Sequence, residues 1–214
     1  MNTLFSLHDV SVHKLHYPDM HIAQGCTTFI SGKSGCGKSS LFCLLNGTQQ
    51  ATSGTITYCN QALEHYDALT LRRDVLLVRQ QIFLFDQSIQ ENFAAFYAYR
   101  RMPCPDAACM QGILDLCQLP LPLNTPCASL SGGEKQRVYL ALFLSLRAPV
   151  VLLDEPTAAL DTTTAHALLG AVQTYCLGYG ASLLVVSHDA ALAQRYAHAH
   201  IALPIPQTGG EHEH

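Results

Sequence analysis

The stretch from Phe29 to Phe42, FISGKSGCGKSSLF, places three glycines and two lysines directly ahead of an apolar, helix-like run. Within it, residues 32–39 match the pattern G-x-x-x-x-G-K-[ST] at every position. Glycines at this spacing let successive backbone N–H groups point inward around an anion, and the following helix directs the positive end of its dipole at the same point. A β-rich run comes before the stretch and a helix after it. The stretch therefore predicts a loop that holds the phosphate chain of a nucleoside triphosphate.

Single residues of this stretch have distinct expected roles. Lys38 is expected to reach the β- and γ-phosphates, and the hydroxyl of Ser39 to ligate Mg²⁺. Cys36 leaves two alternatives open: a helix end could make its thiol reactive, or its side chain simply points outward without a role. The other expected phosphate contacts are Gly32, Lys33, Ser34, Gly35, Cys36, Gly37 and Ser40.

A second motif stands at residues 150–155, where four apolar residues are followed by Asp154 and Glu155. A buried parallel strand that ends in acids places them at the carboxyl edge of the sheet, where ligands bind. Asp154 then suits Mg²⁺, held through water, and Glu155 suits the base that orients or deprotonates the attacking water. The alternative is a strand that only ends at solvent, and the presence of Lys38 and Ser39 argues against it.

Apolar runs alternate with helical patterns along the chain, which favours an α/β fold with a mostly parallel sheet covered on both faces. Residues 86–129 break the alternation: they are rich in aromatics and then in prolines, and they predict a helical lobe. Strands are expected at 4–12, 27–30, 54–58, 75–78, 150–153 and 182–186, and helices at 131–146 and 162–177.

The composition limits the possible classes. The chain has 214 residues, 49% of them hydrophobic, and a formal net charge of −4, so no basic field points to nucleic acid. No apolar run approaches the ~20 residues that cross a bilayer, and the N-terminus lacks the pattern of a signal peptide. Nine cysteines without a CxxC pair are expected to be reduced thiols of a cytosolic protein.

The third motif is LSGGEKQR, residues 130–137. Ser131 and Glu134 match a capping box, so a helix should begin at Ser131, and Gly132 and Gly133 expose N–H groups there. This makes a second helix end that could grasp a phosphate. The motif resembles the signature sequence of ATP-binding cassette (ABC) ATPases, in which it serves the ATP of a partner chain, head to tail.

The other motifs follow in the order of that family. Gln80 resembles the Q-loop glutamine, with Gln81 as the alternative; Asp161 in AALD resembles the D-loop, and His188 resembles the switch histidine. The resemblance spans about residues 4–200. It implies one domain over residues 1–214: a P-loop NTPase core with an N-terminal antiparallel β subdomain, a helical lobe inserted at about 86–130, and a flexible tail at 204–214. The implied cofactors are ATP and Mg²⁺, the latter held by Ser39, Gln80 and Asp154.

One departure concerns the aromatic side chain that stacks on adenine. The family usually places it ~20–25 residues before the phosphate loop, whereas Tyr17 lies only 15 residues before Gly32. Tyr17 is expected to stack on adenine in this shortened segment, and His13 and His16 are the alternatives.

Histidines crowd the chain at both ends. Such spacing can bind Zn²⁺ or Ni²⁺, but no cysteine or carboxylate partner is evident, so solvated side chains without a metal are the simpler expectation. The histidines in question are His8, His13, His16 and His21, then His198 and His200, and the terminal EHEH.

The resemblance implies the ATP-binding subunit of a transporter, peripheral on the cytoplasmic face of the cell membrane. It would act as a head-to-tail homodimer, or with a related cassette, on separate transmembrane permease subunits, without nucleic acid. The segment after the glutamine, Phe83 to Phe96, resembles the permease-docking region. The alternative is a soluble cassette ATPase of a cofactor-assembly complex. A nucleotide-binding protein without turnover fits less well, because Glu155 and His188 are intact.

Overall fold

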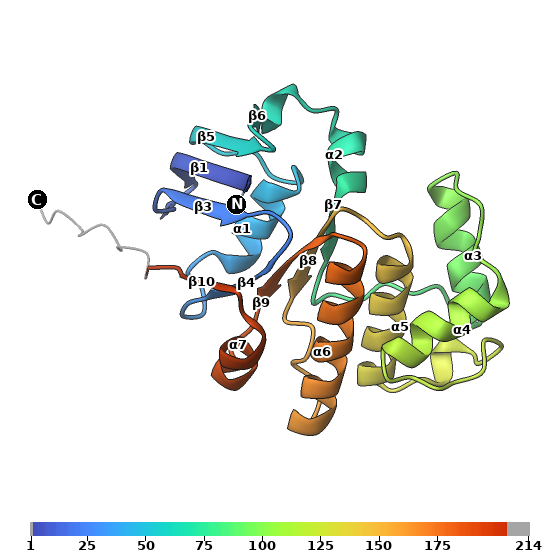
Figure 1. Ribbon diagram of the computed structural model, residues 1–214. Helices are drawn as coiled ribbons and strands as arrows, with labels where there is room; N and C mark the ends of the chain where they lie inside the picture. Colours follow the sequence, from blue (N-terminus) through green and yellow to red (C-terminus); the bar gives the residue numbers. More distant parts are fainter. Residues whose placement is uncertain (1, 205–214) are drawn as a thin grey trace, which may run out of the picture.

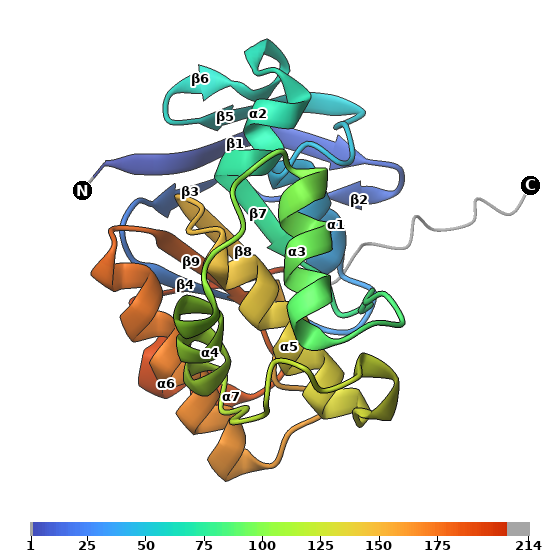
Figure 2. The ribbon, with the colours of Figure 1, turned by 90° about the vertical axis from the view of Figure 1, so that its right-hand side faces the viewer.

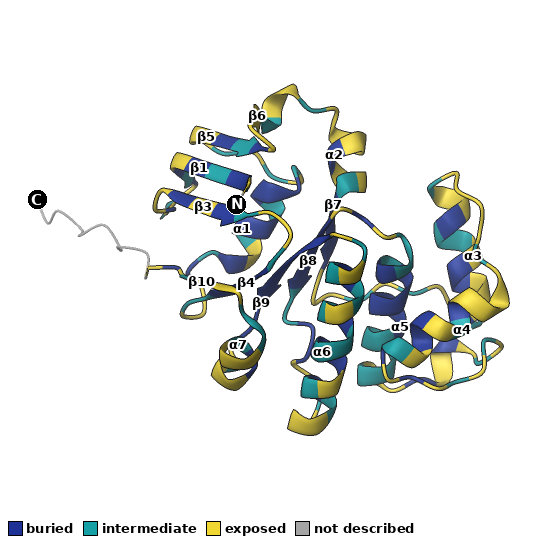
Figure 3. Ribbon diagram, in the orientation of Figure 1, coloured by how far each residue is buried: buried dark blue, intermediate teal, exposed yellow. Residues whose placement is uncertain are grey.

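The computed structural model describes residues 2–204, so the predicted tail from residue 205 onward lies outside the described residues. At the centre is a parallel sheet in the strand order β10-β4-β9-β8-β7 (Figure 1). Strands β7, β8 and β9 are almost wholly buried runs of Val and Leu (Figure 3), as expected for a sheet covered on both faces. These strands are β4 (Thr27–Ser31), β7 (Val75–Val78), β8 (Val150–Asp154), β9 (Ser182–Val186) and β10 (Ala199–Ala202).

Two hydrophobic cores lie on opposite faces of this sheet, because neighbouring residues of a strand point to opposite sides. Val151 and Leu153 of β8 belong to the core formed with α3–α6, whereas Val150 and Leu152 belong to the core formed with α1 and a second sheet. The helices are α1 (Lys38–Leu45), α2 (Ala68–Asp74), α3 (Ile89–Tyr99), α4 (Ala107–Leu116), α5 (Gly132–Ser145), α6 (Thr162–Gly178) and α7 (Ala190–Tyr196), with short 3₁₀ turns η1 (Leu63–His65) and η2 (Cys127–Ser129).

The second sheet is antiparallel and forms the N-terminal subdomain, as the resemblance implied. Its central strand pairs with three others and covers α1. The strands are β1 (Thr3–Val12), β2 (Leu15–His16), β3 (Met20–Ala23), β5 (Ser53–Tyr58) and β6 (Gln61–Ala62).

The helical lobe lies on the other side of the molecule, where α3 and α4 pack beside α5 (Figures 1 and 2). The long predicted strands and helices are confirmed within one or two residues. Within residues 2–204, no helix combines the length and the apolar character that crossing a bilayer requires.

Candidate nucleotide-binding site

The glycine-rich loop wraps the N-terminus of α1. Gly37 stands at the N-cap with a left-handed φ of 93°; no side chain caps the helix, and its first turn has no acidic residue. Nζ of Lys38 donates to the backbone oxygens of Gly32 (2.9 Å) and Lys33 (3.2 Å). The uncapped N–H groups and the adjacent cation form a site that suits phosphate.

A hollow of about 300 Å³ opens beside this loop at the carboxyl edge of the parallel sheet. It brings together most of the residues that the motifs singled out, although they are far apart in sequence. Gln80 lines the hollow and Gln81 does not, which favours Gln80 over Gln81 as the Q-loop glutamine. The lining residues are Leu15, Ser34, Gly35, Gly37, Lys38, Ser39, Ser40, Gln80, Asp154, Glu155, Val186 and His188.

Oxygen ligands for a hard cation meet in this hollow. Ser39 at the start of α1, Gln80 after β7 and Asp154 at the end of β8 line it together. Hydroxyl, amide and carboxylate oxygens are the ligands that Mg²⁺ accepts beside phosphate and water. The donor set therefore fits Mg²⁺ held with a nucleotide.

Glu155 is the most constrained residue of the site. Its φ of 52° is left-handed, its N–H donates to O of Val186 (3.0 Å), and its carbonyl accepts from Nε2 of Gln136 (3.1 Å). Oε1 lies 3.2 Å from Nε2 of His188, and this buried atom accepts no well-aligned hydrogen bond within residues 2–204. Burial raises the pKa of Glu155, the charges of His188 and Lys38 lower it, and Asp154 raises it. A half-buried carboxylate with a raised pKa suits a general base.

The N-terminus of α5 is built differently and stands outside this hollow. The hydroxyl of Ser131 donates to Oε2 of Glu134 (2.6 Å) and accepts from its N–H (3.3 Å), which completes the predicted capping box. Ser131 and Gly132 are exposed, and a β-carbon on Gly132 would meet no atom within 4 Å. This helix end is open to a ligand from outside the chain.

Asp161 likewise lies away from the hollow. Its carboxylate caps α6, accepting from the N–H of Thr164 (3.0 Å) and from its hydroxyl (2.6 Å). These bonds lower the pKa of Asp161. Because Asp161 does not line the hollow of its own chain, a contact of Asp161 with nucleotide remains a prediction for an assembly of two chains.

The expectation that Tyr17 stacks on adenine is wrong. Its side chain is 1% exposed, so no face of the ring is free, and its hydroxyl donates to O of Gly37 (2.9 Å). Burial, opposed by a hydrogen bond with Ser40, raises its pKa to about 12. Tyr17 instead packs against the phosphate loop at Gly37. The two alternatives, His13 and His16, are exposed.

Sequence reasoning missed Leu15. It lines the nucleotide hollow, and its Cδ1 would lie 2.8 Å from a β-carbon built on Gly37. The register of β2 with β1 places it there, so no local motif could have indicated it.

Cys36 does not point outward as one alternative held. It is buried, and its Sγ lies 2.5 Å from the place of a β-carbon on Gly32. The thiol packs beneath the loop, and any larger residue at Gly32 would displace it.

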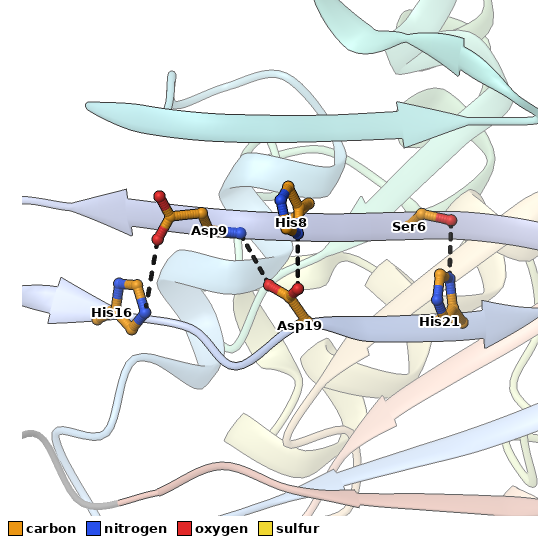
Figure 4. A network of polar contacts seen from close by, with 6 residues as sticks. All are labelled: Ser6, His8, Asp9, His16, Asp19 and His21. Atoms are coloured by element: carbon orange, nitrogen blue, oxygen red, sulfur yellow. Dashed lines mark hydrogen bonds and ion pairs between the residues drawn. The ribbon is translucent and has the colours of Figure 1, made fainter.

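The N-terminal histidines have partners that sequence reasoning did not find (Figure 4). Nδ1 of His8 lies 2.6 Å from the Asp19 carboxylate, and Nδ1 of His21 lies 3.0 Å from Oγ of Ser6. Nε2 of His16 lies 3.9 Å from Asp9. Within residues 2–204, no three His, Cys, Asp or Glu side chains gather as a metal site requires; the terminal EHEH lies outside the described residues.

An aromatic row connects the segment after Gln80 with α5. Phe83 and Phe85 are 59% and 41% exposed, and their ring centroids lie 5.0 Å apart. Phe85 contacts Phe96 at 6.1 Å, and Phe96 contacts Tyr139 of α5 at 6.4 Å. The row begins at the surface and ends in the helix that Ser131 caps.

The fold and the site together define a nucleotide-binding protein of the P-loop class. Its structural marks are a phosphate loop between β4 and α1 and acids at the end of β8, a parallel strand separated from β4 by β9. The chain belongs to the ABC transporter family, whose model matches residues 15–158. It is thus an ATP-binding cassette, the ATPase domain of that family.

Curated relatives share about a third of their residues with the chain. The ATP-dependent lipid A-core flippase of Vibrio parahaemolyticus is 34% identical over 183 residues, which cover 81% of this chain and 31% of the flippase. The mating factor M secretion protein mam1 of Schizosaccharomyces pombe is 35% identical over 190 residues, which cover 87% of this chain and 14% of that protein. The chain spans about a third or less of the length of these relatives.

Solved structures confirm the fold. A bacterial Atm1-family ABC exporter with ATP bound superimposes with a TM-score of 0.83 at 25% identity, over 95% of this chain and 37% of the exporter. A dimeric ATP-binding cassette in a post-hydrolysis state, bound to ADP and Pi, gives a TM-score of 0.81 at 25% identity, over 94% of both chains.

Proposed function

We propose that this chain is the cassette that drives a membrane transporter by hydrolysing ATP held with Mg²⁺. The observation that carries the proposal is the hollow at the end of the parallel sheet, where the phosphate loop, metal ligands and base meet. We also propose that residues 2–204 form one cassette domain.

Each residue of the hollow has one proposed role. Lys38 and the loop N–H groups bind the phosphates, and Ser39, Gln80 and Asp154 hold Mg²⁺. The metal neutralises charge on the phosphates when bound. Glu155 takes the proton of the attacking water. His188, whose Nε2 lies 3.2 Å from the Glu155 carboxylate, orients that carboxylate.

The second helix end supports a site shared between two chains. Ser131 and Gly132 lie outside the hollow and are exposed, so the nucleotide they contact is proposed to be that of a second cassette. A head-to-tail dimer then forms two such sites. The dimeric cassette with ADP and Pi supports this proposal.

A membrane-spanning partner is inferred from the exposed surface at Phe83 and Phe85. Exposed aromatic side chains are typical of interface cores. We propose that a membrane-spanning transporter component binds them. We further propose that the cassette lies on the cytoplasmic side of the membrane. Separate permease subunits remain our expectation. The relatives are named as a flippase, a secretion protein and an exporter, which supports export.

The first experiment measures ATP hydrolysis by the purified chain with and without Mg²⁺, beside Lys38→Ala. We expect Mg²⁺-dependent turnover that the variant loses. A chain that binds ATP but never turns it over, alone or with membranes, would contradict the ATPase proposal.

The second experiment separates transport from soluble assembly. The chain is co-expressed with a candidate permease, and the cassette retained in washed membranes is counted. Phe85→Ala should weaken the affinity that retains the cassette by about thirtyfold or more, as expected for an aromatic hot spot worth at least ~2 kcal/mol. Leu69→Ala is the matched control, since Leu69 on α2 is 67% exposed and outside this surface. Retention that ignores Phe85, together with co-purification of a soluble complex, would favour the cofactor-assembly alternative.

A further inference from the structure

A second hollow, of about 440 Å³, adjoins the nucleotide hollow on the side of β7. Ser39, Gln80 and Asp154 line both hollows, so the two meet at the residues proposed to hold Mg²⁺. The second hollow continues to residues that the mechanism does not use: Cys43, Leu77, Arg79 and Gln81.

Arg79 is the one cationic side chain among the described residues that line this hollow. Its Nη2 donates to Sγ of Cys43 at 3.5 Å. A thiol is a weak acceptor and a guanidinium has five N–H donors, so this contact leaves most of the donors free. Within residues 2–204, no carboxylate oxygen lies within ion-pair distance of Arg79. The guanidinium therefore presents unpaired positive charge to the hollow.

The position of Arg79 follows from its contact with α1. Cys43 stands four residues after Ser39 on that helix, so their β-carbons lie one turn apart, roughly 6 Å. The guanidinium at Cys43 is thus about one helical turn behind the hydroxyl proposed to bind Mg²⁺. Gln80 follows Arg79 directly and lines both hollows.

The charges along this route favour an anion once the metal is bound. Asp154 alone would repel phosphate at the junction of the two hollows. A divalent cation on Ser39 and Asp154 more than offsets that single negative charge. With the metal bound, an anion at the junction would no longer be repelled, and the guanidinium would lie ahead of it.

We propose that Arg79 forms an anion subsite for inorganic phosphate, which receives the phosphate released from ATP and guides it out of the protein. The inference rests on the proposed function, because hydrolysis supplies this phosphate. No bond forms or breaks in the transfer. The phosphate exchanges its contact with Lys38 for the guanidinium, whose planar fork can hold two oxygens at once.

The test is product inhibition. Turnover is followed through ADP formation while sodium phosphate is added, with sodium chloride at equal ionic strength as the salt control. Arg79→Gln should raise the phosphate inhibition constant about tenfold, as expected for a lost charge-assisted hydrogen bond. The KM for ATP should stay within about twofold, because Arg79 does not line the nucleotide hollow. Arg79→Lys should fall between the two.

Arg147→Gln is the charge-matched control, since Arg147 is exposed and lies 4.9 Å from the centre of the Tyr179 ring, outside both hollows. Its phosphate inhibition should equal that of the wild type. Equal inhibition of the wild type and Arg79→Gln, or a wild type that hydrolyses ATP without any inhibition by phosphate, would overturn the subsite. If the chain hydrolyses no ATP, the proposed function fails by itself. The subsite is then tested by ³¹P NMR line broadening of inorganic phosphate with Mg·ADP: broadening lost in Arg79→Gln supports it, and broadening that is absent or unchanged overturns it.

Discussion

The two helix ends proposed to grasp phosphate are built in opposite ways. The N-terminus of α1 has no side-chain cap and no acid in its first turn, and Lys38 lies buried against the loop. The N-terminus of α5 is exposed and already capped, because Glu134 occupies both the hydroxyl and the N–H of Ser131. The first end is ready for an anion, whereas the second must exchange a carboxylate for one.

The α3 helix provides an internal reference for this comparison. Ser88 and Glu91 form a capping box with the same three distances, 2.8, 2.6 and 3.3 Å, as Ser131 and Glu134. No glycine follows Ser88, whereas Gly132 and Gly133 follow Ser131. The open glycines are therefore what distinguishes the N-terminus of α5 from that of α3.

The strongest test breaks the two ends in separate chains. Lys38→Ala and Ser131→Arg should each lose about 1,000-fold in turnover, since the first removes a donor to the phosphates and the second fills the open end of α5 with a bulky side chain. Mixed dimers contain one site with both defects and one intact site. An equimolar mixture should therefore regain about a quarter of the wild-type sites, because half of its dimers are mixed. No recovery in mixtures whose mixed dimers are verified by mass would contradict a shared site.

Glu155→Gln should lower turnover by about 100-fold or more while ATP still binds, because the base is lost and the phosphate loop is not. Size-exclusion chromatography with ATP should then show a stabilised dimer. In the wild type, the raised pKa of Glu155 places the acid limb of the turnover–pH profile above that of an ordinary carboxyl group. Turnover like that of the wild type would remove Glu155 from its role.

The same raised pKa predicts an effect on stability. The folded state binds the Glu155 proton more tightly than the unfolded state, so the ionised carboxylate lowers stability as pH rises through the folded pKa. Glu155→Gln should therefore raise Tm near neutral pH, and the gain should vanish below about pH 4, where both states are protonated. A Tm difference that is constant with pH would contradict the burial of this charge.

Ser131→Ala and Ser88→Ala separate binding from capping. Both should cost about 1 kcal/mol of stability in denaturant unfolding, the usual value of an N-cap. Turnover should fall about tenfold in Ser131→Ala alone, because a hydrogen bond to a charged phosphate is lost. Equal turnover in the two variants would reduce Ser131 to a capping residue.

The smallest effect is expected for Glu134→Gln. The amide oxygen can still accept from Ser131, so stability should fall by a few tenths of a kcal/mol, the share of the helix dipole. Removal of the negative charge should instead tighten ATP-driven dimerisation about twofold. Weaker dimerisation would show that the carboxylate helps Ser131 engage the nucleotide.

The sequence predicted those parts of the site that short motifs position. Lys38, Ser39, Asp154 and Ser131 each stand at the end of a strand or the start of a helix, and the local pattern determines where such ends fall. The long strands β8 and β9 were predictable for the same reason, since uninterrupted apolar runs indicate burial on both faces.

What escaped prediction depends on contacts between distant segments. Tyr17 is buried because its N–H pairs with O of Val10 and its hydroxyl reaches Gly37, and no local spacing indicates either bond. The bond from Gln136 to Glu155 joins α5 to the end of β8 in the same way. The short elements α2, α7 and β10 were missed because they are too short to show a period and lack the uninterrupted apolar run that indicated β7, β8 and β9.

The aromatic row from Phe83 through Phe85 and Phe96 to Tyr139 has a thermodynamic consequence. If a partner bound at Phe85 shifts the ring contacts that lead to α5, it changes the affinity of the Ser131 helix end for nucleotide. Linkage then requires that nucleotide at Ser131 alter the affinity for that partner by the same factor. The two affinities, each measured with and without the other ligand, must give one coupling free energy, and Phe96→Leu should bring it toward zero while leaving both ends of the row in place.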